Sequence, residues 1–395
     1  MKEGWGYKKL NELCEVITKG TTPTTLGYTF SEVGINFIKI ESISTNRKLL
    51  RDKLNHISEE CNKSMSRSQL QESDLLFSIA GALGRIYIVE KSVLPANTNQ
   101  ALAIIRLKNK QDLFLRYLSY YLSSNTLKRQ IDKDKVGVAQ LNLSLSQIKN
   151  FVIPIPSIKV QQHIVEELDL LSSIIEKKKA QLNELDNLAQ SLFCEMFGDP
   201  ITNDKGWEVK QIGDICNPVK NIKWNAFSEE DTFTYIDLSA VDRSDRCIKD
   251  TIFICKNDAP SRAKQIVKTG DVLFGTTRPT LKRVCTINKE FDGSICSTGF
   301  CVIRPKQEII KSHIVYYNLL TNSFYAYIEP LQSGASYPAV TDKIVKSFTI
   351  PIPPIELQQE FASKIEFIER QKEVINKSIN EVETLFNSRM DYYFN

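Results

Sequence analysis

The chain has 395 residues, of which 42% are hydrophobic, and it carries a formal net charge of +4 at pH 7. This length allows two or more domains with buried cores. No apolar run approaches the roughly 20 residues that a membrane-spanning helix needs, and the start of the chain lacks the apolar stretch of a signal peptide. Nine cysteines without a Cys-x-x-Cys pair, together with only three histidines, argue against a metal site and predict reduced thiols in a cytoplasmic protein.

Basic residues gather in four places despite the small net charge. The clusters are Arg47, Lys48, Arg51 and Lys53; Lys128, Arg129, Lys133 and Lys135; Arg262, Lys264 and Lys268; and Arg278, Lys282 and Arg283. Such clusters attract the phosphates of nucleic acids. Taken alone, however, each is more typical of a solvated face, so composition leaves the partner open.

In chain order, the residues up to about 150 have the pattern of a mixed domain in which strands dominate. Segments that alternate or are rich in β-branched residues predict strands at 36–43, 74–79, 85–89 and 101–107, and helical spacing predicts a helix over 113–131. The second half repeats this order, with strands near 234–238, 271–274, 284–287 and 300–303 and a helix near 311–327. Each half is therefore expected to be α+β, around a twisted and mainly antiparallel or mixed sheet.

One long motif occurs twice. Residues 151–162, FVIPIPSIKVQQ, return at 348–359 as FTIPIPPIELQQ, a shift of 197 positions. A period this long is a whole folding unit, and two copies predict a pseudo-two-fold molecule suited to a target with two halves. The segments between the shared apolar positions differ: residues 81–85 read GALGR where 276–280 read TTRPT. One scaffold with divergent loops predicts two different recognition surfaces.

A long amphipathic stretch follows each copy of the motif. Apolar residues recur at spacings of mostly three and four from Val160 to Met196 and from Leu357 to Met390, as in a coiled coil. A helix of about 36 residues would be about 54 Å long. Ser157 suits its N-cap and Gly198 its end. A dimerisation coiled coil is the alternative, but pairing within the chain avoids the entropy cost of association. The two helices would then run antiparallel, as a rigid spacer with a globular head at each end.

These residues resemble the specificity subunit of Type I restriction–modification systems. The resemblance is carried by Ile153–Gln162 with its tail Leu182–Asp199, and by a second copy that keeps both prolines and both glutamines and ends in Tyr-Tyr-Phe at 392–394. Lys19–Pro23 is similar to a Gly-x-Thr-Pro segment at the start of these recognition domains, where the second half has Lys220–Lys223. The resemblance covers the whole chain.

The resemblance implies a DNA-recognition subunit without catalytic activity. Residues 1–152 and 201–349 would be two target-recognition domains, each reading one half of a bipartite DNA target. Residues 153–200 and 350–395 would be helical spacers that dock two methyltransferase subunits, to which restriction (translocase and nuclease) subunits are added. This chain would bind no cofactor, whereas partner subunits would use S-adenosylmethionine, ATP and Mg²⁺. Because one turn of B-DNA is about 34–36 Å long, rigidly separated heads could enter successive grooves, with helix length as the ruler.

Motifs for chemistry in this chain itself are weak. A methyltransferase needs an Asn/Asp-Pro-Pro-aromatic loop, and Asn217–Lys220 lacks the second proline and the aromatic residue. Asp199, Glu208 and Lys210 could be read as a nuclease set, but this spacing arises easily by chance. No histidine lies in a triad motif. The alternatives to the specificity subunit are a two-headed DNA-binding regulator that needs no partner, and a standalone methyltransferase or nuclease.

The candidate DNA-reading residues are polar side chains on the divergent loops. Arg and Lys can donate to guanine, and Asn and Gln can pair with adenine, although a phosphate contact or a plain loop position is the alternative for each. In the first half they are Lys19, Thr21, Thr22, Arg85, Asn97, Asn99, Gln100, Gln140 and Asn142. In the second half they are Lys220, Lys223, Arg278, Lys282, Arg283, Ser297, Thr298, Ser336 and Tyr337.

The candidate contacts to partner subunits flank the ends of the two predicted long helices. Aromatic anchors are enriched at interfaces, and for the glutamine pairs helix capping is the alternative. The residues are Gln161, Gln162, Phe193, Phe197, Gln358, Gln359, Tyr392 and Phe394.

Overall fold

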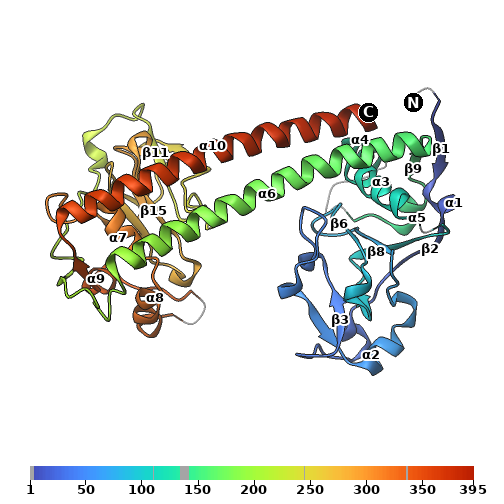
Figure 1. Cartoon of the computed structure of the whole chain (residues 1–395), viewed down its shortest axis with the longest axis horizontal. Coiled ribbons are helices and arrows are strands. Elements are labelled where there is room, and N and C mark those ends of the chain that lie inside the picture. The colour runs from blue at the N-terminus through green and yellow to red at the C-terminus, as the bar shows by residue number, and fades with distance from the viewer. Residues whose placement is uncertain (1–3, 110, 134–141, 244, 335–336) are drawn as a thin grey trace. The chain divides into compact units, whose positions relative to one another are not determined.

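The computed structural model describes residues 4–109, 111–133, 142–243, 245–334 and 337–395. The chain forms two compact units (Figure 1): unit 1 comprises Met1–Lys179 with Lys377–Asn395, and unit 2 comprises Ala180–Asn376. The longest helices, α6 (Ile158–Phe197) and α10 (Ile355–Phe394), have 40 residues each and contribute one part to each unit. This division cuts both helices near their middle, so the predicted four-segment division at 152, 200 and 349 stays a prediction.

Unit 1 contains two sheets. The first has the order β2-β8-β5-β6 and is antiparallel throughout, with β2 (Cys14–Lys19), β8 (Leu102–Leu107), β5 (Leu75–Ser78) and β6 (Ile86–Ile88). The second has the order β4-β3-β7, with β4 (Asn55–Ile57), β3 (Ile35–Ile38) and β7 (Ala96–Thr98), and β3 pairs parallel with β7. Leu75 and Phe77 enter one apolar core and Leu76 enters another. Successive side chains point to opposite faces of a strand, so β5 is buried on both faces.

Unit 2 repeats this arrangement. Its antiparallel sheet has the order β15-β14-β17, with β15 (Val284–Thr286), β14 (Val272–Gly275) and β17 (Phe300–Ile303). A second sheet has the order β12-β11-β16-β13, with β12 (Ile252–Ile254), β11 (Phe233–Ile236), β16 (Ile295–Ser297) and β13 (Ala263–Ile266). Strand β11 pairs parallel with β16, as β3 does with β7. The predicted α+β class is therefore confirmed for both units.

The duplicated proline motif is a strand, which the sequence analysis did not predict. In unit 1, β9 (Val152–Ile155) pairs antiparallel with β1 (Gly6–Lys9), and in unit 2, β18 (Thr349–Ile352) pairs in the same way with β10 (Glu208–Gln211). Each pair is a two-stranded sheet. Proline lacks an N–H group, and a strand with a neighbour on only one side tolerates that loss. The motif thus ties the start of each globular half to the start of its long helix.

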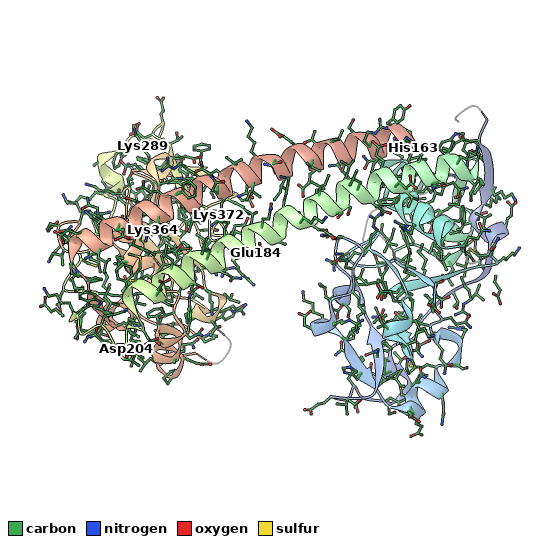
Figure 2. All side chains as sticks on the ribbon, viewed as in Figure 1. His163, Glu184, Asp204, Lys289, Lys364 and Lys372 are labelled. Atoms are coloured by element: carbon green, nitrogen blue, oxygen red, sulfur yellow. The ribbon has the colours of Figure 1, made fainter. Side chains whose placement is uncertain are left out.

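Within each unit the two long helices run antiparallel. In unit 1 the start of α6 shares a core with the end of α10, through Ile164 and Leu168 on one helix and Met390 on the other. In unit 2 the end of α6 packs on the start of α10, through Phe193 and Phe361, whose ring centroids are 5.7 Å apart. Ion pairs also join the helices: Lys179 to Glu383 in unit 1 at 2.7 Å, and Lys372 to Asp186 in unit 2 at 2.9 Å. Lys372 is labelled on α10 in Figure 2.

Each predicted shorter helix is in fact two helices. In unit 1, α3 (Asp112–Ser123) and α4 (Asn125–Lys133) replace the single helix expected over 113–131. In unit 2, α7 (Ser312–Asn318) and α8 (Asn322–Ile328) replace the one near 311–327. The hydroxyl groups of Ser124 and Thr321 accept backbone N–H groups three residues on, and this capping starts a new helix. The other α-helices of the described chain are short: α1 (Leu10–Leu13), α2 (Glu59–Ser64), α5 (Leu145–Lys149) and α9 (Asp342–Ser347).

One buried ion pair occurs at the same place in both units. Arg106 donates to Asp74 from Nε and Nη2, at 2.7 Å each, and Arg304 donates to Asp271 at 2.8 and 2.7 Å. The aspartates are 0% and 1% exposed. Hydrogen bonding to its aspartate raises the pKa of each arginine above its ordinary value. Each aspartate directly precedes a strand, β5 or β14, and each arginine lies at the end of the neighbouring strand, β8 or β17, so the pair joins these two strands at one end of the sheet.

Candidate nucleic-acid interface

In unit 2, two loops meet beyond the end of β14. The backbone N–H of Thr276 donates to Gly299 at 2.8 Å, and that of Arg278 donates to Pro338 at 2.7 Å. Val340 closes the arrangement by donating to the carbonyl of Thr276 at 3.0 Å. The loop before β15 is therefore held against residues 337–340, a contact between segments about 60 positions apart in the sequence.

The joined loops bring positive side chains together. The Arg278 guanidinium lies 4.6 Å from the ring centroid of Tyr337, and the Lys282 ammonium lies 4.6 Å from that of Tyr325. Burial and then the neighbouring charges of Arg243 and Arg278, partly offset by Asp237, lower the pKa of Arg283 below its ordinary value. The buried Nε of Arg283 has no hydrogen-bond acceptor among the described residues.

We call Arg243, Arg278, Lys282 and Arg283 the unit 2 cationic cluster. Crowded like charges with an unused donor are stabilised by an anion, and the adjoining tyrosine rings suit a nucleic acid. Arg278, Lys282, Arg283 and Tyr337 were predicted from the sequence, and the structure brings them together. Arg243 was missed, because its turn is far from the loop in sequence and carries no motif.

The other predicted residues of unit 2 lie apart from this cluster or outside the described residues. Ser297 is 3% exposed and its hydroxyl accepts the N–H of Gly299, so its selection as a DNA contact is corrected to a turn-forming role. Thr298 is exposed. Lys220 and Lys223 are exposed on a segment that is hydrogen-bonded along β13. Ser336 lies outside the described residues.

In unit 1, the loops at 19–22 and 97–100 form a second candidate surface. The Thr22 hydroxyl donates to the Gln100 side chain, and the Thr21 N–H donates to the Thr98 carbonyl at 3.3 Å. Gly20 permits this approach, because a Cβ there would lie only 1.9 Å from the Thr98 carbonyl oxygen. Lys19, Thr21, Thr22, Asn99 and Gln100 are thereby brought together.

Two predicted residues of unit 1 hydrogen-bond to neighbouring turns. Asn97 is fully buried and donates to the Asn62 side chain at 2.8 Å and to the Met65 carbonyl at 3.2 Å. Arg85 donates through one nitrogen to the carbonyls of Ile40 and Ile43, at 3.1 and 2.8 Å. The selection of Asn97 as a DNA contact is corrected, since its amide is buried and committed to a neighbouring turn. Arg85 is partly exposed and uses one nitrogen in these bonds, so its selection stays a prediction.

The last two predicted residues of unit 1 lie near the loop that precedes β6. Asn142 is exposed, and the next residue, Leu143, hydrogen-bonds to the Ile79 carbonyl at 2.8 Å. Asn142 therefore borders this loop, as Ala339 and Val340 border its counterpart in unit 2. Gln140 lies outside the described residues.

Most of the residues proposed to contact partner subunits face inward. Gln161 donates to the Pro156 carbonyl at 2.9 Å, and Gln358 donates to the Pro353 carbonyl at 2.8 Å. These bonds tie the start of each long helix to the segment before it, and both side chains are buried. Phe193, Phe197 and Phe394 are 1%, 2% and 5% exposed, so these three aromatic side chains are not free to anchor a partner. They pack on helices of the globular part, such as Phe193 on Tyr317 and Phe394 on Tyr121. Gln162, Gln359 and Tyr392 are exposed.

Neither a membrane helix nor a metal centre is found in the parts of the chain that the structure describes. None of their helices combines the length and apolar character needed to cross a membrane. No group of three or more His, Cys, Asp or Glu side chains is placed to hold a metal ion there.

Comparison with known proteins identifies the domain in both halves. The family model described as "Type I restriction modification DNA specificity domain" matches residues 2–187 and 204–384. The putative type I restriction enzyme MjaX specificity subunit of Methanocaldococcus jannaschii is 23% identical, over 96% of this chain and 90% of that protein. The type I restriction enzyme EcoBI specificity subunit of Escherichia coli is 30% identical over 43% of this chain and 36% of that protein.

A solved structure has a similar fold over the whole chain. It comes from work on complex assembly and conformational transition of the type I R-M system, and it matches 100% of this chain and 98% of its own with a TM-score of 0.55 and 18% identity. The resemblance that the proline–glutamine motifs carry is thus confirmed over both halves. The chain belongs to the family of Type I restriction–modification DNA specificity proteins.

Proposed function

We propose that this chain is the non-catalytic specificity subunit of a Type I restriction–modification complex and that each unit reads one half of a bipartite DNA target. One observation carries the proposal: the specificity domain occurs twice in the chain. The two copies have similar cores but unlike loop surfaces. Unit 1 offers threonine, asparagine and glutamine beside one lysine, whereas unit 2 offers mainly arginine and lysine. Amides suit adenine and arginine suits guanine, so two different half-sites follow from this difference.

The helix pair would dock two copies of a modification subunit. Among the large apolar side chains exposed on the helices, two in each unit recur at matching positions: Leu170 and Leu385 in unit 1, 61% and 48% exposed, and Phe367 and Leu188 in unit 2, 60% and 53% exposed. Leu170 and Phe367 are 197 positions apart, as are Leu188 and Leu385, which is the period of the internal repeat. A surface that repeats with the scaffold favours one kind of partner bound twice. Restriction subunits would join this core, and the partners would use S-adenosylmethionine, ATP and Mg²⁺.

The proposal is tested by activity with and without partners. The purified chain, incubated alone with DNA, S-adenosylmethionine and Mg²⁺, is expected to leave the DNA unmodified and uncut. Cells that carry the complete system are expected to show methylation at one bipartite sequence by methylome sequencing. Methylation or cleavage by the chain alone would contradict the proposal, and tight specific binding without any effect of partners would favour the DNA-binding regulator.

Arg85 lies directly before β6 and Arg283 directly before β15. We expect their replacement to have opposite effects on stability and on DNA binding. Arg85→Ala removes two hydrogen bonds from a charged donor and should lower the free energy of unfolding by about 1–3 kcal/mol. Arg283→Ala relieves crowding in the cationic cluster, so it should leave stability unchanged or higher while weakening DNA binding about tenfold.

Urea unfolding and equilibrium DNA binding of the two variants provide the comparison. Each variant serves as the control for the other, since both remove one arginine from the same place in the repeat. A loss of DNA affinity for Arg85→Ala with unchanged stability would reverse our assignment of the two roles.

A further inference from the structure

Arg47 stands in an unusual backbone conformation in unit 1. It lies in a tight turn closed by hydrogen bonds from Ser44 to Lys48 at 2.9 Å and from Arg47 to Ser44 at 3.2 Å. Its φ of 61° is left-handed, where a residue with a Cβ is strained and glycine is favoured. Residues held in such conformations cluster at functional sites.

Unit 2 has an arginine at the same place. Arg246 has a φ of 52°, and its turn begins and ends at a bridge between Val241 and Ile248, as the turn of Arg47 does at Ile43 and Leu49. The two turns differ in length and in most of their residues. An arginine in the same strained conformation is nevertheless present in both, although neither turn needs an arginine in order to close.

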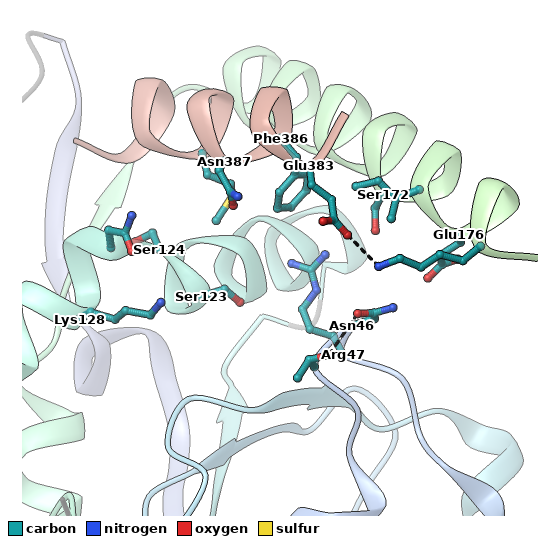
Figure 3. A pocket seen from close by; sticks show the side chains of 15 residues that line it. Asn46, Arg47, Ser123, Ser124, Lys128, Ser172, Glu176, Glu383, Phe386 and Asn387 are labelled. Carbon is teal, nitrogen blue, oxygen red and sulfur yellow. Dashed lines mark hydrogen bonds and ion pairs between the residues drawn. The ribbon is translucent and has the colours of Figure 1, made fainter. Parts of the chain in front are cut away.

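The Arg47 side chain points into a cavity of about 300 Å³ between its turn, the junction of α3 and α4, and the helix pair of unit 1 (Figure 3). Its guanidinium carbon lies 3.8 Å from the ring centroid of Tyr120, which holds the group by a cation–π contact. Lys128 also lines the cavity. Neither the guanidinium of Arg47 nor the ammonium of Lys128 has an acceptor among the described residues.

The carboxylates of this cavity are already neutralised. Glu176 pairs with Lys48 at 2.7 Å. Glu383 pairs with Lys179 at 2.7 Å, as the dashed line from Glu383 marks (Figure 3). The cavity therefore holds two positive charges without a counter-charge among the described residues, alongside the amide groups of Asn46 and Asn387. Two cations with neutral donors suit a phosphate group, which takes a planar arginine fork on two of its oxygens.

Unit 2 builds a similar pair of cations from different segments. The buried Nε of Arg246 has no acceptor among the described residues. Burial raises the pKa of Tyr316, Tyr317 and Tyr325, and the positive charge of Arg246 partly offsets that rise. Tyr325 stands 197 positions after Lys128, so unit 2 lacks that lysine. Lys282, from the loop of the cationic cluster, lies over the ring of Tyr325 and supplies the second charge.

We propose that Arg47 with Lys128, and Arg246 with Lys282, each bind one backbone phosphate of double-stranded DNA. The inference rests on the proposed DNA-reading function and adds contacts that carry no sequence information. Phosphate contacts position a protein on the duplex, whereas base edges specify the sequence. The strained turns hold the two arginines ready for this contact, one in each unit.

Salt-dependent DNA binding of the assembled complex tests the proposal. Binding is measured to an unmethylated duplex that carries the target sequence and to a duplex of equal length with both half-sites scrambled. The salt concentration is varied between about 50 and 200 mM. Arg47→Ala and Arg246→Ala should each weaken binding to both duplexes by the same factor, about tenfold, and lower the slope of log K against log salt by about 1. Arg47→Lys keeps the charge and should keep the slope.

Lys177→Ala is the matched control, because it removes one exposed positive charge from α6 in the same unit and should leave the slope unchanged. If Arg47→Ala leaves the salt slope unaltered, the proposal is overturned. An unaltered slope together with a lower thermal midpoint of unfolding would show that Arg47 has a structural role. Loss of binding to the target duplex alone would make Arg47 a base reader. Saturable binding of inorganic phosphate that Arg47→Ala abolishes without a change in slope would assign the cavity to a small ligand.

The two levels of the proposal fail separately. A wild-type complex that does not prefer its target over the scrambled duplex contradicts the proposed function. Even then, the salt slopes of the wild-type and variant complexes can be compared on either duplex. That comparison alone decides whether the arginines bind phosphate.

Discussion

Inserting four residues after Lys179 in α6 and four after Asn376 in α10 is expected to give an active complex that recognises the same two half-sites across a wider gap. Each helix would lengthen by about 6 Å, which is nearly two base pairs at about 3.4 Å each. Both insertions fall where one compact unit ends and the other begins. The packing inside each unit, such as Met390 in unit 1 and Phe361 in unit 2, is therefore left intact.

Methylome sequencing of cells carrying the altered system reads the gap directly. The control is the same insertion in α6 alone, which leaves helices of unequal length and should abolish or greatly reduce methylation. A doubly extended complex that still methylates the original sequence would show that the helices do not set the spacing.

Replacing Asp271 by alanine is expected to lower the free energy of unfolding by about 3–5 kcal/mol. The change leaves the Arg304 guanidinium, whose side chain is 15% exposed, without its two-point partner. It also leaves the Lys268 N–H without the carboxylate that accepts it at 2.8 Å. Asp74→Ala should have a similar effect in unit 1, where the side chain of Arg106 is 12% exposed.

Urea unfolding followed by a spectroscopic signal measures the loss. Lys249→Ala is the matched control: it breaks exposed ion pairs with Asp242 and Asp245 in the same unit and should cost no more than about 1 kcal/mol. Replacing both partners, Asp271→Leu with Arg304→Met, should recover most of the stability because no unpaired charge remains. If Asp271→Ala costs no more than the control, the buried pair is not an anchor of the sheet.

Much of the architecture followed from the sequence because it depends on periodicity and repetition. The patterns at 74–79 and 271–274 predicted strands, and the structure has strands at Leu75–Ser78 and Val272–Gly275. The 197-residue repeat predicted two similar units, and the spacing of apolar residues after each proline motif predicted two long helices. Left-handed Gly198, with a φ of 73°, ends α6 as expected.

Only the tertiary structure decided which polar side chains reach solvent. Asn97, Ser297 and Arg85 lie on loops by their sequence context, yet their hydrogen bonds go to neighbouring turns. Phe193 and Phe394 lie near the C-terminal ends of the two long helices. Sequence alone does not say whether the side chains there pack on the rest of the unit or meet water. Each long helix also belongs partly to each unit, so the apolar side chains of one helix enter two different cores.

The candidate interface shows the same limit most clearly. Arg278, Lys282 and Arg283 were visible as a basic run, but their setting depends on Tyr325, Tyr337 and Arg243 from three other segments. Likewise, the sequence shows Arg47 only as one member of a basic cluster. The structure places its side chain in a cavity, against Tyr120 and beside the helix pair. Sequence determines which charges a loop carries, because that is local chemistry. Whether those charges are neutralised depends on side chains brought close by long-range packing, and only the folded chain decides it.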